Sequence, residues 1–216
     1  MGERTMVDFG FGLLRRAMVR RIPRRLLVLC AAGGLLLVGC KAAQAENRSD
    51  DPLGGVALTT QDGKPLEPRD YRGKTLVLNF FFTSCAVVCP AQAKVLREAR
   101  NTLPADVRER VEFLSVSVDP ENDTPEALAR FSRKHAAGLR EFTFARASEE
   151  GTSALTKRLA AFDTTRPDGT QPAGHSTAIY LFDPHGRLMQ RYGGGTEAAR
   201  LAREIQQIDS MFRSGG

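Results

Sequence analysis

A continuous apolar run followed at once by a cysteine pair is the feature that most constrains this chain. The run covers Thr75–Phe82 and contains β-branched, aromatic and aliphatic side chains around one asparagine. A run this short and continuous is typical of a central strand that is buried on both faces. Cys85 and Cys89 follow within a few residues, and residues 92–103 have helical composition. The sequence therefore places two thiols at a strand-to-helix junction.

The spacing of the two cysteines indicates what chemistry they can perform. Pro90 suits the first turn of a helix, so we expect the helix to begin near Val88 or Cys89, with Cys85 in the preceding loop. Side chains at i and i+4 can lie on one side of a turn, and the N–H groups and dipole of a helix start favour negative charge. Both cysteines are therefore expected to form thiolates readily, which can hold a soft metal ion or exchange disulfides. A purely structural disulfide is the weaker interpretation, because a bridge across five residues constrains little of the unfolded chain.

The N-terminal residues have the pattern of an export signal. Six arginines between residues 15 and 25 precede thirteen apolar residues, 26–38, and a glycine then precedes Cys40. This pattern looks like a bacterial lipoprotein signal, so residues 1–39 are predicted to be removed and Cys40 to be lipidated. Thirteen apolar residues are fewer than the roughly 20 that a membrane-spanning helix needs. The basic segment is long, and we expect translation to begin at Met18.

Removal of the signal changes the charge balance of the chain. The full sequence has 31 Lys+Arg and 25 Asp+Glu, of which seven arginines and two acids lie in residues 1–39. The mature chain is therefore nearly neutral, with 24 basic and 23 acidic side chains, and we expect no nucleic-acid partner. Residues 40–52 lack large apolar side chains, which predicts a flexible tether. Residues 53–216 are enough for one domain with a full core.

The remaining segments alternate between strand and helix patterns. An N-terminal β-hairpin is predicted from a short strand at residues 56–58 and a turn at Asp62–Gly63. Later strands are predicted at residues 111–118, 142–144, 177–182 and 188–192. Helices are predicted after Thr124 and Ser148, which can cap them, and around Leu201–Phe212. This order predicts an α/β sandwich whose first strands pair in parallel through right-handed crossovers.

Three histidines occupy different positions in this order. His135 lies at the polar end of a predicted helix, where a solvated side chain that favours the helix dipole when protonated is the simplest interpretation. His185 lies in a hairpin turn, where a polar residue needs no function. His175 ends a long polar loop directly before a central-type strand, which is where α/β folds place site residues. Position alone does not distinguish a functional His175 from an exposed loop residue.

Three segments together resemble the Sco/SenC family: residues 82–90 with the CxxxCP loop, residues 117–125, and residues 175–186. Two shorter matches, Asp62–Lys64 and Asp70–Lys74, extend the resemblance to roughly residues 53–212. It implies a thioredoxin-like fold, namely a three-layer sandwich with a central mixed β-sheet.

The resemblance also implies copper as the bound metal, held by Cys85, Cys89 and His175. Two thiolates suit soft Cu(I), and an added imidazole lets the site hold Cu(II) as well. The usual role of the family is to deliver copper to, or reduce the cysteines of, the binuclear copper centre in subunit II of cytochrome c oxidase. We therefore expect a monomeric copper metallochaperone, anchored by lipid to a membrane on the periplasmic side of a bacterial cell envelope.

Other functions could use the same cysteine pair. A periplasmic thiol-disulfide oxidoreductase or a redox sensor is the alternative, so the sequence leaves open whether the chain is an enzyme. The chain also departs from the family, which commonly has a proline and an acid after the first cysteine, where Ala86 and Val87 stand here. A looser loop and altered copper affinity and redox poise are expected, since a nearby acid would raise the pKa of the thiols. Asp119 and Asp123 match family positions but are expected to serve the turn and the helix cap.

Overall fold

The computed structural model describes residues 51–136, 139–161 and 177–213. These residues belong to one compact unit, Gln44–Gly216. In the part of the chain that the structure describes, no helix is long and apolar enough to cross a membrane.

Three features predicted from the sequence lie outside the described residues. They are the signal peptide, the lipidation site Cys40 and the proposed ligand His175. Each of them stays a prediction.

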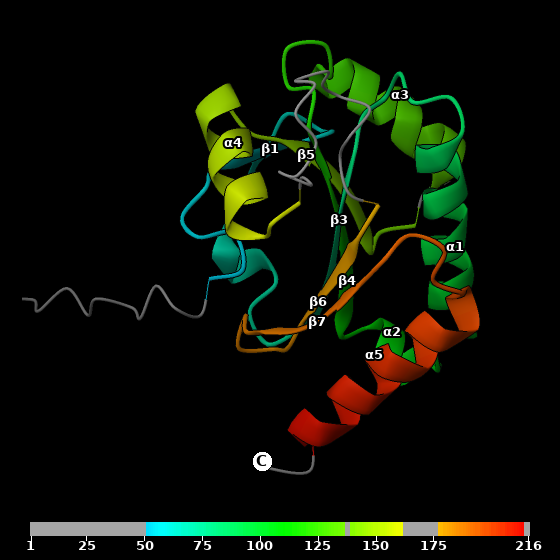
Figure 1. Cartoon of the computed structure of the whole chain (residues 1–216). Coiled ribbons are helices and arrows are strands. Elements are labelled where there is room, and N and C mark those ends of the chain that lie inside the picture. Colours follow the sequence, from blue (N-terminus) through cyan, green and yellow to red (C-terminus); the bar gives the residue numbers. More distant parts are fainter. Residues whose placement is uncertain (1–50, 137–138, 162–176, 214–216) are drawn as a thin grey trace, which may run out of the picture. The chain divides into compact units, whose positions relative to one another are not determined.

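Among the described residues, seven strands form one mixed sheet, with the order β2-β1-β5-β4-β3-β6-β7 (Figure 1). The strands are β1 (Leu58–Thr60), β2 (Pro65–Leu66), β3 (Thr75–Phe81), β4 (Val111–Ser117), β5 (Phe142–Arg146), β6 (Ile179–Phe182) and β7 (Leu188–Tyr192). β3, β4 and β5 are parallel, whereas β6 runs antiparallel to β3 and β1 antiparallel to β5. The hairpins β1–β2 and β6–β7 form the two edges. The predicted mixed sheet and N-terminal hairpin are confirmed.

The helices cover both faces of this sheet. They are α1 (Val88–Thr102), α2 (Ala105–Arg108), α3 (Pro125–His135), α4 (Glu149–Arg158) and α5 (Ala198–Arg213), with a 3-10 turn at Pro68–Asp70. Leu96 of α1, Leu128 of α3 and Leu201 of α5 belong to one core cluster. Leu155 of α4 belongs to the other. Figure 1 shows α4 on the opposite side of the sheet from α1, α3 and α5, which confirms the three-layer sandwich.

β3 is buried at all of its residues because the sheet is covered on both faces. Alternate side chains of a strand point to opposite faces. Val77 and Phe81 accordingly pack in the cluster with α1, α3 and α5, whereas Leu76, Leu78 and Phe80 pack in the cluster with α4. The continuous apolar run in the sequence is therefore the consequence of two cores that share one strand.

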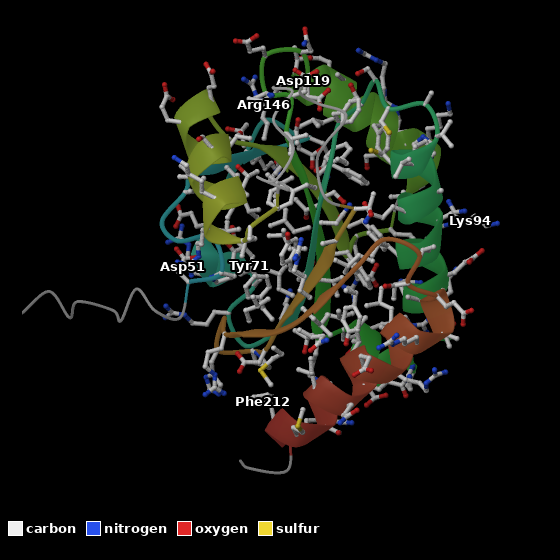
Figure 2. The ribbon with its side chains drawn as sticks, viewed as in Figure 1. Asp51, Tyr71, Lys94, Asp119, Arg146 and Phe212 are labelled. Atoms are coloured by element: carbon white, nitrogen blue, oxygen red, sulfur yellow. The ribbon has the colours of Figure 1, made fainter. Side chains whose placement is uncertain are left out.

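The first strand begins two residues later than predicted because a turn precedes it. Asp51, labelled in Figure 2, lies at the start of this turn. Its side chain accepts hydrogen bonds from the N–H groups of Leu53 and Gly55, and its carbonyl accepts one from Arg158. A backbone bond from Val56 N to the carbonyl of Leu53 closes the turn. Asp51 therefore belongs to the folded domain, which was predicted to start two residues later, at residue 53.

Capping residues hold the helix starts near the carboxyl end of the parallel strands. The Thr124 side chain accepts from the N–H of Ala127 at 3.3 Å, and Ser148 accepts from Gly151 at 3.1 Å, as predicted. Each such cap stabilises a helix by about 1 kcal/mol. Because β3 and β4 are parallel neighbours, the loops that follow Phe81 and Ser117 lie at the same edge of the sheet.

Candidate functional site

The cysteine pair lies where the sequence predicts it. Cys85 is in the loop after β3 and Cys89 is in the first turn of α1. The backbone N–H of Cys89 donates to the Cys85 Sγ at 3.2 Å. Val87 precedes the first helical residue and supplies no capping hydrogen bond of its own. The Cys85 sulfur therefore takes the place of a capping oxygen for one of the free N–H groups at the helix start.

The two thiols have different surroundings. Cys89 is 3 % exposed in the core, and burial, followed by its hydrogen bond to Cys85, raises the pKa of its thiol to about 12. Cys85 is only partly buried. Burial by itself would raise the pKa of Cys85, but hydrogen bonds from the Cys89 thiol and from nearby backbone N–H groups outweigh it and lower the pKa. The expectation that both cysteines form thiolates readily is therefore correct for Cys85 and wrong for Cys89.

A buried carboxylate ties the cysteine loop to the neighbouring loop. Asp123 is fully buried and accepts from the Thr83 N–H at 3.1 Å, the Thr83 hydroxyl at 2.5 Å and the Ser117 hydroxyl at 2.5 Å. These bonds satisfy a charge that would be costly to bury without partners. The sequence assigned Asp123 to the turn and the helix cap, but its side chain bonds instead to Ser117 and to Thr83, two residues before Cys85.

A chain of polar side chains crosses the sheet beneath α1. The Ser115 hydroxyl donates to Asn79 Oδ1 at 2.7 Å, and Asn79 Nδ2 donates to Gln92 Oε1 at 2.8 Å. Gln92 Nε2 in turn donates to the carbonyl of Thr177 at 2.6 Å. This chain ties the helix that carries Cys89 to the residue that leads into β6. The sequence indicated this chain, because Asn79 and Ser115 are polar residues within otherwise apolar strands and pair with each other across β3 and β4.

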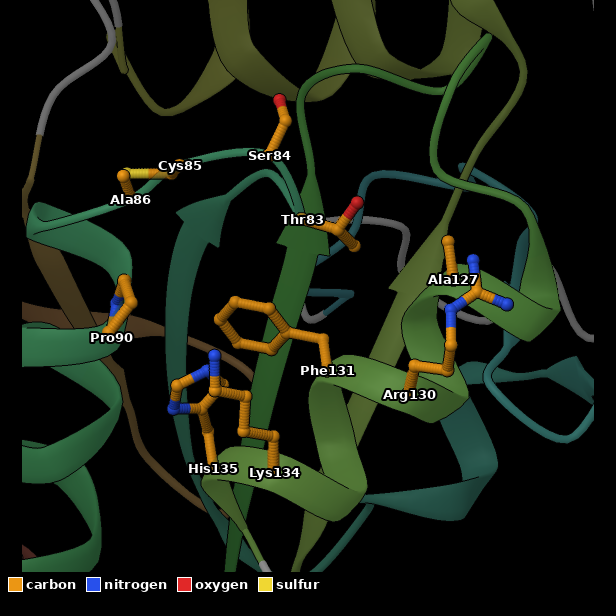
Figure 3. A pocket seen from close by; sticks show the side chains of 10 residues that line it. All are labelled: Thr83, Ser84, Cys85, Ala86, Pro90, Ala127, Arg130, Phe131, Lys134 and His135. Carbon is orange, nitrogen blue, oxygen red and sulfur yellow. The ribbon is translucent and has the colours of Figure 1, made fainter.

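A pocket of about 420 Å³ opens between the cysteine loop and α3 (Figure 3). The loop side consists of residues 83–86 and Pro90. The helix side consists of side chains at positions i, i+3, i+4, i+7 and i+8, which form one face of a helix. These residues are Ala127, Arg130, Phe131, Lys134 and His135. Cys85 thus faces a helix that the sequence did not connect with it.

His135 lines this pocket, which was not predicted from the sequence. It ends α3 as predicted, but its ring packs on Phe131 at 4.3 Å and lines the pocket with Cys85. Burial, and then the charges of Lys134 and Arg97, lower the pKa of its imidazole. His135 is partly exposed at the end of α3, as expected, but the lowered pKa of its imidazole means that its surroundings disfavour the protonated form. Helical spacing placed it on the face of Phe131, but only the tertiary structure turns that face toward the cysteines.

His185 and Asp119 have structural roles in turns. The backbone N–H of His185 donates to Asp183 Oδ1 at 2.9 Å in the β6–β7 turn, as expected for a turn residue. Asp119 accepts from Asn122 Nδ2 at 2.9 Å, which confirms its role in the turn before α3. Among the described residues, no three His, Cys, Asp or Glu side chains gather as metal ligands. The set of Cys85, Cys89 and His175 is not tested by this, because His175 lies outside those residues.

A dithiol at the start of the helix that follows the central strand, on a mixed sheet covered by helices on both faces, defines a thioredoxin-like protein. One sulfur of the pair is partly exposed and the other is buried. The model of the SCO1/SenC family matches residues 45–209. The chain belongs to this family.

Individual relatives agree with this assignment. A SCO1 homolog of Bacillus subtilis is 25 % identical over 161 residues, covering 74 % of this chain and 83 % of its own length. A Stutzerimonas stutzeri protein whose name describes it as copper-binding is 28 % identical over 155 residues, covering 71 % and 74 %.

Solved structures agree as well. A SCO1/SenC lipoprotein of Bacillus anthracis matches with a TM-score of 0.60 and 30 % identity, over 71 % of this chain and 92 % of that one. BsSco, described with a disulfide switch and as one of the Sco family of cytochrome c oxidase assembly proteins, matches with a TM-score of 0.59 and 25 % identity, over 71 % and 89 %. These matches confirm the predicted family and fold.

Proposed function

We propose that this chain is a copper metallochaperone in the assembly of cytochrome c oxidase. The observation that carries the proposal is the pairing of Cys85 and Cys89, with the Cys89 N–H 3.2 Å from the Cys85 sulfur, at the mouth of a pocket. Two adjacent sulfurs are the donors that Cu(I) prefers. Relatives named as copper-binding or as oxidase assembly proteins support the same cargo and pathway.

Cys85, Cys89 and His175 are the proposed ligands of the copper cargo. Cys85 is the more exposed of the two sulfurs, so it is the ligand that a client can reach first. Cys89 is buried in the core, so it would keep its position while Cys85 transfers copper to a client. The imidazole of His175 completes the set for Cu(II), and subunit II of the oxidase is the proposed client.

A copper titration tests this function. We expect His175→Ala to retain Cu(I), because the thiolates dominate that affinity, and to lose much of its Cu(II) binding and thiolate-to-copper absorption. The wild type and the variant are titrated with Cu(II), followed by visible absorption and electron paramagnetic resonance, beside an insulin-reduction assay. Identical copper spectra together with rapid insulin reduction by the wild type would contradict the metallochaperone.

A thiol-disulfide oxidoreductase is the second candidate, and the inequality of the two thiols favours it. The Cys85 thiolate would attack a substrate disulfide, form a mixed disulfide and release one substrate thiolate. Cys89 would then lose its proton and attack the Cys85 sulfur, which releases the second substrate thiolate. The substrate is reduced, and the protein is left with a Cys85–Cys89 disulfide. The insulin assay above measures this activity directly.

Lipid anchoring at Cys40 is proposed from the signal-like N-terminus. The lipid would hold the protein on a membrane at the periplasmic side of the cell envelope. We expect Cys40→Ala to give an unprocessed or soluble protein, because the sulfur that carries the lipid is gone. Cell fractionation with labelled fatty acid measures this. A cleaved, lipid-labelled Cys40→Ala protein in the membrane fraction would show that the anchor is elsewhere.

A further inference from the structure

The α3 wall of the pocket at Cys85 is basic. Arg130 and Lys134 are exposed, lie one helical turn apart and line the pocket together with Cys85 (Figure 3). The described residues that line this pocket include no aspartate or glutamate. A partner that enters it therefore meets two positive charges on the wall opposite the loop that carries the reactive sulfur.

Neither cation has a salt-bridge partner within the part of the protein that the structure describes. The nearest acid along the helix is Glu126, whose pKa is lowered first by its hydrogen bond with Thr124 and, among its lesser causes, by the charge of Arg130. Glu126 is not part of the pocket lining, so the charged side chains of the lining itself are positive.

Exposed apolar side chains follow the cysteine loop. Val87 is 73 % exposed and Val88 is 47 % exposed, two and three residues after Cys85. Neither Ala86 nor Val87 carries a charge that could offset the α3 cations. Exposed aliphatic side chains next to a charged rim are typical of protein interaction surfaces.

We propose that this surface docks a client segment that carries acidic side chains beside its cysteine. The inference rests on the proposed function, in which Cys85 exchanges cargo or a disulfide with a client thiol. Val87 and Val88 contact the apolar part of the segment, and Arg130 and Lys134 attract its carboxylates. Opposite charges of this kind accelerate encounter by about 10-fold to 1000-fold at low ionic strength, so the acidic client reaches Cys85 faster than a basic one.

The test measures attack of Cys85 on synthetic peptides and needs no copper. Each short peptide carries one cysteine, activated as a mixed disulfide with 2-nitro-5-thiobenzoate and flanked by glutamate, glutamine or lysine. The Cys85 thiolate attacks the peptide sulfur, forms a protein–peptide disulfide and releases the coloured thiolate. With the reduced protein carrying Cys30→Ser and Cys40→Ser, in which Cys85 and Cys89 are the remaining thiols, we expect the glutamate peptide to react at least about tenfold faster than the lysine peptide. High salt should shrink this ratio, because it screens exposed charges.

Charge-reversal variants locate the effect. In Arg130→Glu/Lys134→Glu, the glutamate-to-lysine rate ratio should fall to about one or below. The matched control is Arg133→Glu/Arg203→Glu, which makes the same change in net charge at exposed residues outside the pocket, and it should keep most of the wild-type ratio. The ratio is taken within each protein, so a change in the intrinsic reactivity of Cys85 cancels.

A wild type without preference, or an equal ratio in all three proteins, would overturn the docking proposal. Copper titration of the same three proteins is independent of this result. Retained copper binding with no peptide preference refutes the docking surface alone, whereas peptide preference without copper binding refutes the metallochaperone alone.

Discussion

Cys85 connects local structure with chemistry at the scale of a single residue. Its sulfur accepts the N–H of Cys89 at the start of α1, in a position that a serine or aspartate often fills. The same bond stabilises the thiolate form, because hydrogen bonds to a charged group favour it. For Cys89, burial outweighs the backbone hydrogen bond from Phe82 that favours its thiolate. One helix start thus makes two identical side chains chemically unequal.

Alkylation should reveal this inequality. In the reduced protein, we expect iodoacetamide to modify Cys85 more than about tenfold faster than Cys89, because the thiolate is the nucleophile. The pKa of Cys85 is lowered, so its reactivity should fall off at a lower pH than in the unfolded chain. The pKa of Cys89 is raised to about 12, so its reactivity should rise only in strong alkali. Mass spectrometry of the digested protein measures both rates, and equal rates would contradict the assignment.

Asp123 acts at the same scale through Thr83. Asp123→Asn replaces a carboxylate that accepts three donors with an amide that has one acceptor oxygen. We expect the free energy of unfolding to fall by about 1–3 kcal/mol, because buried donors lose their partner. Denaturant unfolding measures this loss. Asp119→Asn is the control, since Asp119 lies nearer the surface, and it should cost less than about 1 kcal/mol.

At the scale of elements, the parallel pairing of β3 with β4 creates the site. It brings the cysteine loop and the loop that leads into α3 to one edge of the sheet. Gln92 then ties α1 to Thr177, just before β6. Three elements that are distant in sequence are thereby held together by a few buried polar side chains.

Gln92→Leu tests the link between α1 and β6. The change removes the bonds of Gln92 with Asn79 Nδ2 and with the carbonyl of Thr177. We expect a loss of about 1–3 kcal/mol in unfolding free energy. Weaker Cu(II) binding is also expected, because Thr177 follows the proposed ligand His175 by two residues. Gln207→Leu, at an exposed position of α5, is the control. Thermal unfolding and Cu(II) titration provide the two measurements, and equal results for both variants would show that the link is dispensable.

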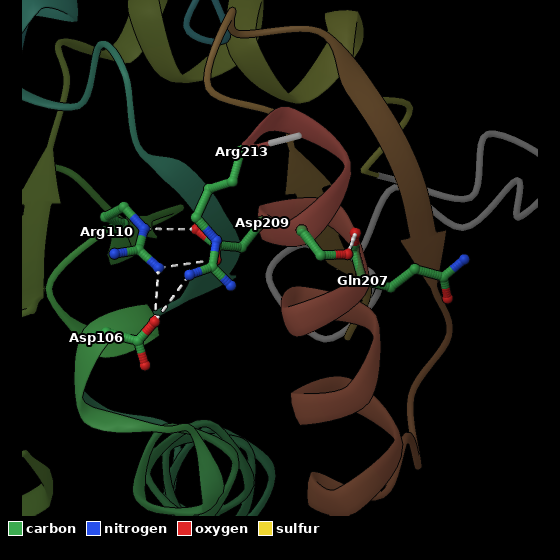
Figure 4. Close-up of polar contacts among 6 residues, drawn as sticks. Asp106, Arg110, Gln207, Asp209 and Arg213 are labelled. Atoms are coloured by element: carbon green, nitrogen blue, oxygen red, sulfur yellow. Dashed lines mark hydrogen bonds and ion pairs between the residues drawn. The ribbon is translucent and has the colours of Figure 1, made fainter. Parts of the chain in front are cut away.

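At the scale of the whole molecule, stability and site chemistry lie in different places. An ion-pair network joins the C-terminal end of α5 to α2 and the start of β4 (Figure 4). Asp209, 5 % exposed, pairs with Arg110 at 2.8 Å and Arg213 at 3.0 Å, and Asp106 also contacts both arginines. An ion pair of a buried carboxylate contributes more to stability than an exposed one, because solvent screens it less.

Asp209→Asn should therefore lower the free energy of unfolding by about 1–3 kcal/mol. Asp106→Asn is the matched control, because Asp106 contacts the same arginines but its side chain is 55 % exposed, and it should cost at most about 1 kcal/mol. Both variants should retain the reactivity of Cys85, since no network residue lines its pocket. Chemical denaturation and thiol alkylation measure the two effects. A larger loss for Asp106→Asn would show that exposure does not govern this network.

Local patterns in the sequence were sufficient to predict the family and the main elements, but not the short helix α2. The apolar run of β3 requires cover on both faces, and the caps at Thr124 and Ser148 mark helix starts through short-range bonds. The CxxxCP spacing likewise places Cys85 in a loop and Cys89 in a helix. Each of these features depends on neighbours within a few residues, so the sequence contains the physical cause.

The tertiary structure alone decided which distant side chains meet these elements. The burial of Cys89, the bond from Thr83 to Asp123, and the turning of His135 and Lys134 toward Cys85 all depend on the packing of α1 and α3 on one sheet face. Helical spacing defines a face but not the partner that it meets. The sequence by itself therefore determined the fold class and the cysteine pair. The pKa difference between the cysteines and the basic wall opposite them arose only when non-local packing set their burial and charge environment.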